Sequence, residues 1–285
     1  MVGPPVVRPM RDEDIDFALA LTASEGWGYS AADFARLRTL EPEGCLVHEY
    51  DGRLQGLLTV TTYGDVAWLG AVVVLPEWRG QHVGQSMMAA ALRFCEGRGV
   101  RSVRLNAYLH VVPFYEKLGF RGETENIRFI VDDPDHREGF SGGRASVVED
   151  PAWLYDLDGR YFGTPRRALL QRLAREKESF VIAVERGGRP VGYLAAGVNE
   201  GACEIGPWVV ESREPVAATT LLEEAFGHAA AGAYAVTAPS ANREAVEMLT
   251  SIGFREAFRT LRMTRGPMPP EDLSGIWGLG GLEKG

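Results

Sequence analysis

The chain has 285 residues, of which 45% are hydrophobic and 24% are charged, and its formal net charge is −9. This composition is typical of a globular protein with room for one large domain or two ordinary ones. The acidic balance and the lack of a basic run argue against a binder of duplex nucleic acid. No apolar run approaches the roughly 20 residues that cross a bilayer, which argues against a membrane-spanning helix.

The first residues, 1–11, contain prolines and no apolar stretch of the kind found in signal peptides. Cys45, Cys95 and Cys203 are odd in number and far apart in the sequence. We therefore expect reduced core thiols rather than disulfide partners or metal ligands, as is usual in the cytoplasm. The sequence thus predicts a cytoplasmic protein with no metal site, no nucleic-acid partner and no membrane partner.

The first quarter of the chain predicts short helices and strands with clear boundary signals. Ser30 can cap a helix that ends before Pro42, because proline disfavours helical geometry in the residue before it. Asp51-Gly52 lies between two apolar runs and predicts a tight hairpin. We expect strands at residues 6–8, 45–50, 54–63 and 66–75, a helix from a cap at Asp12 or Asp14 to about residue 24, and a helix at residues 31–40.

A polar turn follows the long strand and precedes a helix with an apolar stripe. The turn and the first residues of the helix read Arg79-Gly80-Gln81-His82-Val83-Gly84-Gln85-Ser86. Such a loop directs several backbone N–H groups into one concavity at the positive end of a helix dipole. Because the first N–H groups of a helix have no helical acceptor, the pattern predicts an anion site suited to a phosphate. A packing role for the glycines and the arginine is the alternative.

A second motif follows at close spacing. Residues 101–107 alternate as a strand, and the next segment reads Val112-Pro113-Phe114-Tyr115-Glu116-Lys117-Leu118-Gly119-Phe120. Gly119 suits the position just past a helix end, and Phe120 would return the chain to the core as a strand.

The two motifs, in this order, resemble those of the GNAT N-acetyltransferases. That family has a loop reading Arg/Gln-x-x-Gly-x-Gly/Ala and a helix reading Leu-Tyr-Glu-Lys-Leu-Gly-Phe. In this chain His82 stands at the first glycine of the loop pattern. We expect left-handed backbone there, which histidine tolerates better than most residues. The elements expected in residues 1–130 also follow the order of the GNAT fold.

The resemblance implies that acetyl-CoA is the cofactor. The loop would hold its pyrophosphate, and the backbone of the preceding strand would pair with its pantetheine arm. Asn106, at the end of its strand, could contact the cofactor or cap the strand. The implied cofactor-binding residues are Val72, Val73, Val74, Arg79, Gly80, Gln81, His82, Val83, Gly84, Gln85, Ser86 and Asn106.

Tyr115 stands where the family has its general acid. A phenol with a pKa near 10 is suited to protonating a leaving thiolate, and a core tyrosine is the alternative. No general base stands out. Glu25, Asp65, His110 and Glu123 are candidates by residue type alone, and a chain of waters could do the same work.

The segment Glu25-Gly26-Trp27-Gly28-Tyr29 lies between the first two expected helices, where the family covers its acceptor. We interpret it as a substrate lid in which Glu25, Trp27 and Tyr29 face the acceptor. A tryptophan that anchors the two helices is the alternative.

The second half resembles a divergent copy of the first. Gly119-Phe120 and Gly253-Phe254 are 134 residues apart (253 − 119), and Gly56 and Gly192 are 136 apart (192 − 56). Two nearly equal offsets predict a duplicated fold, and two separate modules are the alternative. Before this copy, residues 132–150 predict a linker or surface loop, and Thr164-Pro165 predicts the start of a helix that runs to about residue 177.

The copies differ at the expected site. In place of the glycine-rich loop the second copy has Glu211-Ser212-Arg213-Glu214-Pro215-Val216-Ala217, with two acids and a proline that lacks an N–H. Leu249 stands where the first copy has Tyr115 (249 − 115 = 134). The sequence therefore predicts that the second copy has lost coenzyme A binding.

These observations predict an α+β protein of two tandem GNAT-like domains, each with a mixed, mostly antiparallel central sheet flanked by helices. We expect a catalytic domain at residues 1–131, a linker at 132–150, a degenerate domain at 151–266 and a Pro/Gly-rich tail at 267–285. The tail contains Trp277, which we expect to dock on the body and to help form a wall of the acceptor groove. A floppy tail is the alternative.

The predicted function is transfer of the acetyl group of acetyl-CoA to a primary amine, carried by a small molecule or a peptide. The chain could also form a homodimer. The alternatives are a non-catalytic acyl-CoA sensor and an acyltransferase that uses a longer acyl group.

Overall fold

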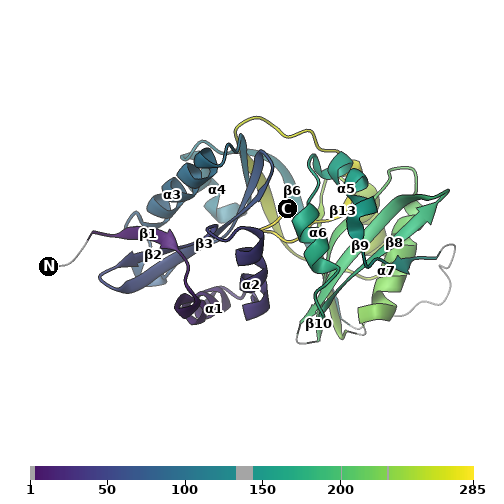
Figure 1. Cartoon of the computed structure of the whole chain (residues 1–285), viewed down its shortest axis with the longest axis horizontal. Helices are drawn as coiled ribbons and strands as arrows, with labels where there is room; N and C mark the ends of the chain where they lie inside the picture. Colours follow the sequence, from purple (N-terminus) through teal and green to yellow (C-terminus); the bar gives the residue numbers. More distant parts are fainter. Residues whose placement is uncertain (1–3, 133–143, 200, 230) are drawn as a thin grey trace. The chain divides into compact units, whose positions relative to one another are not determined.

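The computed structural model describes residues 4–132, 144–199, 201–229 and 231–285 (Figure 1). The chain divides into two compact units that are built from discontinuous segments. The first unit contains Met1–Leu105 with Thr264–Pro267 and Lys284, and the second contains Asn106–Met263 with Met268–Glu283 and Gly285. The domain boundaries expected at residues 131 and 151 stay a prediction about the sequence repeat, and the compact units draw on both repeats.

In the first unit the strands lie in the order β1 (Val6–Pro9), β2 (Cys45–Tyr50), β3 (Arg53–Tyr63), β4 (Val66–Val74) and the first part of β5 (Ser102–Tyr108). Neighbours from β1 to β4 pair antiparallel, and β5 runs parallel to β4. Tyr50 lies opposite Arg53, with positive φ angles of 51° at Asp51 and 69° at Gly52 between them. This confirms the hairpin that the sequence predicts.

Helices cover both faces of this sheet. Helices α1 (Ile15–Ser24) and α2 (Ala31–Leu40) pack on one face, where Leu21, Phe34 and Val47 belong to one buried cluster. On the other face lies α3 (Val83–Gly97), and Figure 1 shows it across the sheet from α1. Its Met87 lies so close to β3 that a Cβ added at Gly56 would be 3.1 Å from the sulfur. The Ser30 hydroxyl accepts from the Asp33 N–H at 3.2 Å and caps α2, as the sequence predicts.

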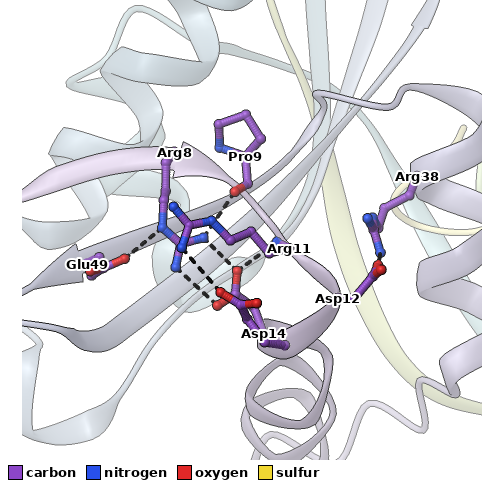
Figure 2. A network of polar contacts seen from close by, with 8 residues as sticks. Arg8, Pro9, Arg11, Asp12, Asp14, Arg38 and Glu49 are labelled. Carbon is purple, nitrogen blue, oxygen red and sulfur yellow. Dashed lines mark hydrogen bonds and ion pairs between the residues drawn. The ribbon is translucent and has the colours of Figure 1, made fainter.

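An ion-pair network fixes the start of α1 against the sheet (Figure 2). The Arg8 guanidinium on β1 donates to Asp14 and to Glu49, each at 2.6 Å, and Asp14 also accepts from the Arg11 N–H at 2.7 Å. The hydrogen bond from Arg8 holds the pKa of the buried Asp14 carboxyl below its usual range, although burial acts in the opposite direction. The network thus sets the direction of the helix whose far end leads to Glu25.

The second unit is a mixed α/β unit with a mostly antiparallel sheet. Its strands lie in the order β12 (Arg255–Arg265), β6 (Arg121–Asp132), β11 (Ala233–Pro239), β10 (Ala202–Val210), β9 (Arg189–Asn199), β8 (Ser179–Arg186) and β7 (Ser146–Val147), and β13 (Ile276–Gly278) pairs with β10. The helices are α4 (Val112–Glu116), α5 (Tyr155–Phe162), α6 (Arg167–Leu173), α7 (Pro215–Ala229) and α8 (Arg243–Ser251), and 3-10 turns lie at Leu109–Val111, Pro151–Leu154 and Leu273–Gly275.

Two stretches of this unit differ from the sequence-based expectations. The helix expected from Pro165 to about residue 177 is the shorter α6, which ends at Leu173. It starts after Arg166, whose N–H and side chain bond to the buried Asp158 carboxylate. Helix α5 was not predicted at all. Of the expected linker, residues 133–143 lie outside the described residues, and Ser146–Val147 form strand β7 beside β8 rather than a loop.

The repeat is visible in the strand lengths. Strands β3 and β9 each have 11 residues, and β4 and β10 each have 9, with the same offset of 136 (189 − 53 and 202 − 66). Helices α3 and α7 each have 15 residues. Two copies of one fold therefore make up the chain.

The last strand of each copy has partners from the other copy. In the second unit, β6 of the first copy pairs antiparallel with β11 of the second, from Asn126 opposite Pro239 to Asp132 opposite Ala233. In the first unit, Arg104 Nε donates to Thr264 Oγ1 at 3.1 Å, just at the end of β12. The two copies have thus exchanged their final strands.

Candidate functional site

The predicted phosphate loop joins β4 to α3. A 3-10 turn at Pro76–Trp78 follows the strand, and the chain then passes through two left-handed residues, Gly80 with φ 77° and His82 with φ 64°. His82 is the N-cap of α3. This confirms the expectation that the position of the first glycine in the loop pattern needs left-handed backbone. The strain of a non-glycine residue there is small for histidine, which visits this region more readily than most.

The first turn of α3 is open to an anion. Its first helical hydrogen bond runs from the Ser86 N–H to the His82 carbonyl at 3.0 Å, so the N–H groups of Val83, Gly84 and Gln85 have no helical acceptor. Within this fully described segment, no acidic residue lies in the first turn and no side chain caps it. The helix dipole adds partial positive charge at the same place. This end of α3 can therefore bind a phosphate group through backbone N–H groups.

Polar side chains of the loop bond to a backbone carbonyl or to each other, and none of them caps the first turn of α3. Gln81 Nε2 donates to the Glu77 carbonyl at 2.8 Å, and His82 Nδ1 lies 2.6 Å from Gln85 Oε1. All three side chains belong to exposed residues. They can turn toward a bound anion without breaking the fold.

Arg79 connects the loop with the predicted acceptor segment. Its Nε donates to the Val74 carbonyl at 2.9 Å, and its Nη2 forms an ion pair with the Glu25 carboxylate. The sequence placed Arg79 in the cofactor loop and Glu25 in the lid but gave no sign that they meet. They are 54 residues apart, and only the fold brings them together.

The end of β4 diverges from β5. The parallel pairing covers only Val66–Leu69 of β4, opposite Ser102–Leu105, and Ala71 then takes a positive φ of 46°. The Leu75 N–H donates to the Gln55 carbonyl of β3. Because the backbone groups of successive residues in a strand face opposite edges, the N–H and C=O of Val74 face away from β3. The side chain of Val73 is buried in the α1/α2 cluster. The strand therefore offers backbone groups at a splayed edge, while Val73 itself serves the core.

The acceptor segment packs more closely than the lid interpretation requires. Trp27 and Tyr29 are partly buried against the α1/α2 cluster, and the Tyr29 ring stacks on Phe34 with 5.4 Å between centroids. The Trp27 N–H donates to the Thr22 carbonyl at 3.0 Å, at the end of α1. This packing favours the alternative in which Trp27 anchors the two helices. A role of these residues toward an acceptor stays a prediction.

Tyr115 lies on α4 in the second unit, where it is only 7% exposed. Its ring meets Phe114 and Phe120 edge-on, with centroids 5.1 and 6.0 Å apart. Burial raises the pKa of the phenol well above its usual range, so the group keeps its proton throughout the neutral pH range. It can act as a proton or hydrogen-bond donor, and not as a base.

Asn106 also lies in the second unit, on β5. Its Nδ2 donates to the Leu282 carbonyl and its Oδ1 accepts from Asn126 Nδ2, each at 2.7 Å. Both ends of the amide thus have protein partners. The proposed contact with the cofactor stays a prediction, and binding of the tail is the role that the structure gives Asn106.

The base candidates mostly have other partners. Asp65 accepts from Arg101 Nε at 2.7 Å, and Glu25 pairs with Arg79. His110 is exposed, and its ring lies over Tyr108 at 6.0 Å between centroids. Among the described residues no cluster of His, Cys, Asp or Glu could hold a metal ion. Nor does that part of the chain contain a helix long and apolar enough to cross a membrane.

The corresponding junction of the second copy contains acids, arginines and a proline in place of the glycine-containing loop. Between β10 and α7, the Glu211 carboxylate accepts from Arg160 at 2.8 Å and from Arg189 at 2.7 Å, and Glu214 pairs with Arg186 at 2.9 Å. The helix begins at Pro215, which has no N–H to offer. The second copy thus has acids held in ion pairs and a proline at the junction where the first copy has N–H groups without a helical acceptor.

Comparison with protein families gives a match to each copy. The model of the acetyltransferase (GNAT) family matches residues 15–120, and that of an acetyltransferase (GNAT) domain matches residues 154–278.

Two named proteins are similar to this chain. Holothin acyltransferase of Pseudoalteromonas sp. (strain SANK 73390) is 25% identical over 270 residues, which cover 92% of this chain and 88% of that protein. The "Putative ribosomal protein bS18-alanine N-acetyltransferase" of Bacillus subtilis (strain 168) is 30% identical over 120 residues, which cover 40% of this chain and 80% of that protein.

Solved structures show the same fold. A "Putative Acetyltransferase" of Pyrococcus horikoshii matches with a TM-score of 0.85 at 22% identity, covering 99% of this chain and 96% of that one. A tandem GNAT protein from the clavulanic acid biosynthesis pathway matches with a TM-score of 0.65 at 16% identity, covering 93% of this chain and 100% of that one. At these identities the likeness concerns the fold, and it extends over both copies.

Proposed function

The chain belongs to the GNAT acetyltransferase family and is a tandem GNAT acyltransferase, and from this premise we propose that it moves the acetyl group of acetyl-CoA to a primary amine. The observation that carries the choice of donor is the open first turn of α3, with left-handed His82 at its N-cap. A diphosphate is the ligand that such a row of backbone N–H groups at a helix N-terminus fits.

The residues of the first copy suit the donor along its length. The N–H groups of Val83, Gly84 and Gln85 would hold the pyrophosphate. The splayed edge at Val74 would pair with the amides of the pantetheine arm, because its N–H and C=O face away from β3. The C=O accepts from Arg79 Nε in the structure and would become available when this guanidinium turns to a phosphate. A backbone N–H at this edge would also polarise the acyl carbonyl, which is where negative charge develops during the attack.

The reaction breaks the thioester C–S bond and forms an amide C–N bond. The amine nitrogen attacks the carbonyl carbon in its neutral form, and its surplus proton leaves to water or to a base. We propose Tyr115 as the donor to the departing thiolate. Its buried phenol is protonated at neutral pH, and a hydrogen bond from it becomes stronger as charge builds up on sulfur.

Arg79 and Glu25 would each contact one substrate: Arg79 a phosphate of acetyl-CoA, and Glu25 the amine acceptor. In the structure they neutralise each other. When the Arg79 guanidinium turns to a phosphate, the Glu25 carboxylate becomes available to attract an amine that arrives as an ammonium ion. This supports an order of binding in which the donor comes first.

The similar proteins suggest two classes of acceptor. Holothin acyltransferase resembles the whole chain, whereas the ribosomal protein acetyltransferase resembles 40% of it. We propose an amine on a small molecule or a peptide. The extent of the first match favours the small molecule, because it includes the second copy.

The three cysteines support a cytoplasmic location for the enzyme. Cys45, Cys95 and Cys203 are buried and free, and burial raises the pKa of each thiol to about 12. Such thiols are nearly always protonated at neutral pH and are inert to exchange.

Calorimetry with acetyl-CoA, followed by a thiol-release assay with a panel of amines, tests the proposal. We expect one binding site per chain and release of free coenzyme A in proportion to acetylated amine. Absence of acetyl-CoA binding would refute the choice of donor. Tight binding with no transfer to any amine would favour the sensor, and faster transfer from a longer acyl-CoA would change the acyl group.

A further inference from the structure

We propose that the chain's own strand β13 fills, in the second copy, the slot that the pantetheine arm of acetyl-CoA would fill in the first. The inference rests on the proposed function, because it takes the splayed edge of β4 as the site of that arm. It adds a ligand for the second copy: an extended peptide segment of the same chain, formed by β13 and the Leu279 that follows it.

The two copies have the same splay at the same register. In the first, Val66–Leu69 pair in parallel with Ser102–Leu105, and the strands then separate. In the second, Ala202–Ile205 pair in parallel with Ala233–Val236 and the pairing also stops after four residues. The offset between β4 and β10 is 136 throughout (202 − 66 and 205 − 69).

Hydrogen bonds on the other edge confirm this register. The Leu75 N–H donates to the Gln55 carbonyl at 2.9 Å in the first copy. The Glu211 N–H donates to the Val191 carbonyl at 2.8 Å in the second, and both residues are displaced by the same 136 positions. Trp208 therefore corresponds to Val72, and its backbone groups face the splayed side as those of Val72 do.

Strand β13 lies in the splay of the second copy. It pairs antiparallel with β10, with Trp208 opposite Gly278 and Val209 opposite Ile276. On the other side, the Leu279 N–H donates to the Thr237 carbonyl of β11 at 2.8 Å. The segment thus has backbone partners on both of the strands that diverge.

The fit is close. A Cβ added at Gly206 would lie 1.8 Å from the Leu279 carbonyl oxygen, and one added at Gly278 would lie 3.0 Å from Val236. Trp277 is 3% exposed and belongs to the buried cluster of the unit, with its ring 5.5 Å from that of Trp208. No space for a pantetheine arm remains beside β10 while β13 is in place.

Further contacts hold β13 and the turn before it at the position that corresponds to the proposed acetyl-CoA site of the first copy. Asn242, the N-cap of α8, donates from Nδ2 to the Ile276 carbonyl at 3.0 Å. The Ser212 N–H, in the counterpart of the phosphate loop, donates to the Tyr161 hydroxyl at 3.1 Å, and Ser212 Oγ lies 2.8 Å from Ser274 Oγ. Protein groups thus satisfy both the strand edge and the loop that would otherwise face a ligand.

The position of Trp277 also corrects an expectation. The sequence suggested that the tail around Trp277 helps to form a wall of the acceptor groove. The docking is confirmed, but the indole lies in the core of the second unit rather than on an open surface. Its role is to hold β13 in the splay.

Amide hydrogen exchange of the full chain, resolved by residue and measured with and without acetyl-CoA, tests the proposal. We expect the Val72 amide to exchange quickly in the free protein and to become protected on addition of acetyl-CoA. We expect the Trp208 amide to be protected under both conditions. If Val72 does not respond to acetyl-CoA, the proposed function of the first copy fails. If Trp208 exchanges quickly or responds to acetyl-CoA, the filled slot is refuted.

A pair of variants separates the strand from the rest of the tail. Trp277→Ala should loosen β13 and raise the exchange rate of Trp208 by at least about tenfold, which corresponds to about 1.4 kcal/mol. Met268→Ala, at an exposed position in the same tail, should leave it unchanged. Equal exchange of Trp208 in both variants would show that β13 does not protect the edge. If Trp277→Ala does not fold, the wild-type exchange data still decide the question.

Discussion

The junction from β4 to α3 and the junction from β10 to α7 share the same strands and helices but differ in the residues at the start of the helix. Each has a nine-residue strand that separates from its parallel neighbour after four pairs, followed by a helix of 15 residues. The first ends in left-handed residues and free N–H groups, and the second in paired acids and a proline. The comparison teaches that a splayed strand edge needs a partner, which the chain's own tail supplies in the second copy and which we propose acetyl-CoA supplies in the first.

The splayed edge needs a partner because a buried backbone N–H or C=O group without a hydrogen bond costs free energy. A buried N–H without a partner costs about 1–3 kcal/mol, so a copy that loses its ligand gains stability from any segment that replaces it. Strand β13 and the following Leu279 supply hydrogen bonds to the two diverging strands, and Trp277 of this segment is buried. The second copy can therefore keep its fold without a bound cofactor.

The largest difference between the copies should be seen at the position of Tyr115, which is Leu249 in the second. Tyr115→Phe keeps the ring between Phe114 and Phe120 but removes the proton donor. We expect turnover to fall by about 10²–10⁴-fold while the affinity for acetyl-CoA stays within about twofold. Steady-state kinetics and calorimetry on the same preparation measure the two quantities.

A matched control is Tyr155→Phe in the second copy, where the hydroxyl is buried without a hydrogen-bond partner among the described residues. That variant should turn over at the wild-type rate. If the two phenylalanine variants are equally active at every pH, Tyr115 is a packing residue and another group protonates the thiolate.

The second largest difference between the copies should be in acetyl-CoA binding when a carboxylate is placed in the first turn of α3 or α7. Gly84→Glu places a carboxylate where an anion must approach the N–H groups, so acetyl-CoA binding should weaken by about 100-fold, or about 2.7 kcal/mol. The corresponding change in the second copy is Val216→Glu, at an exposed position in the first turn of α7. It should not alter binding, as measured by calorimetry. Equal losses in both variants would mean that acetyl-CoA does not choose between the copies.

A smaller comparison concerns one carboxylate–arginine pair in each copy. Asp158 and Arg166 are fully buried, whereas the side chains of Asp14 and Arg8 are 5% and 16% exposed. Asp158→Asn leaves Arg166 without its anion and should cost about 3–5 kcal/mol of the free energy of unfolding. Asp14→Asn should cost about 2 kcal/mol, because Arg8 keeps its bond to Glu49 and some contact with water. Denaturant unfolding of the two variants tests this order.

The Asp14 variant has a pH dependence with a defined sign. Because the pKa of Asp14 is lower in the folded state, its stabilising effect is fully present above the unfolded pKa of about 3.9 and is lost as the pH falls through the folded value. The difference between wild type and Asp14→Asn should thus be constant from pH 5 to 8 and shrink in stronger acid. A difference that grows with falling pH would contradict the pairing with Arg8.

The sequence by itself determined the elements whose signals are local. The Asp51-Gly52 hairpin, the Ser30 cap, the strand–loop–helix junction and the left-handed position of His82 depend on neighbours within a few residues, and all of them are present. The duplication was also readable, because equal spacings between matching segments survive when most side chains have changed.

Only the tertiary structure decided which distant segments are partners. Arg79 and Glu25 are far apart in the sequence, and no local pattern announces their ion pair. The same holds for β6, which pairs with β11 of the other copy, and for β13, whose three residues carry little strand signal by themselves. Strand partners are selected by free backbone edges and by the shape of the core, and these properties exist only once the chain has folded.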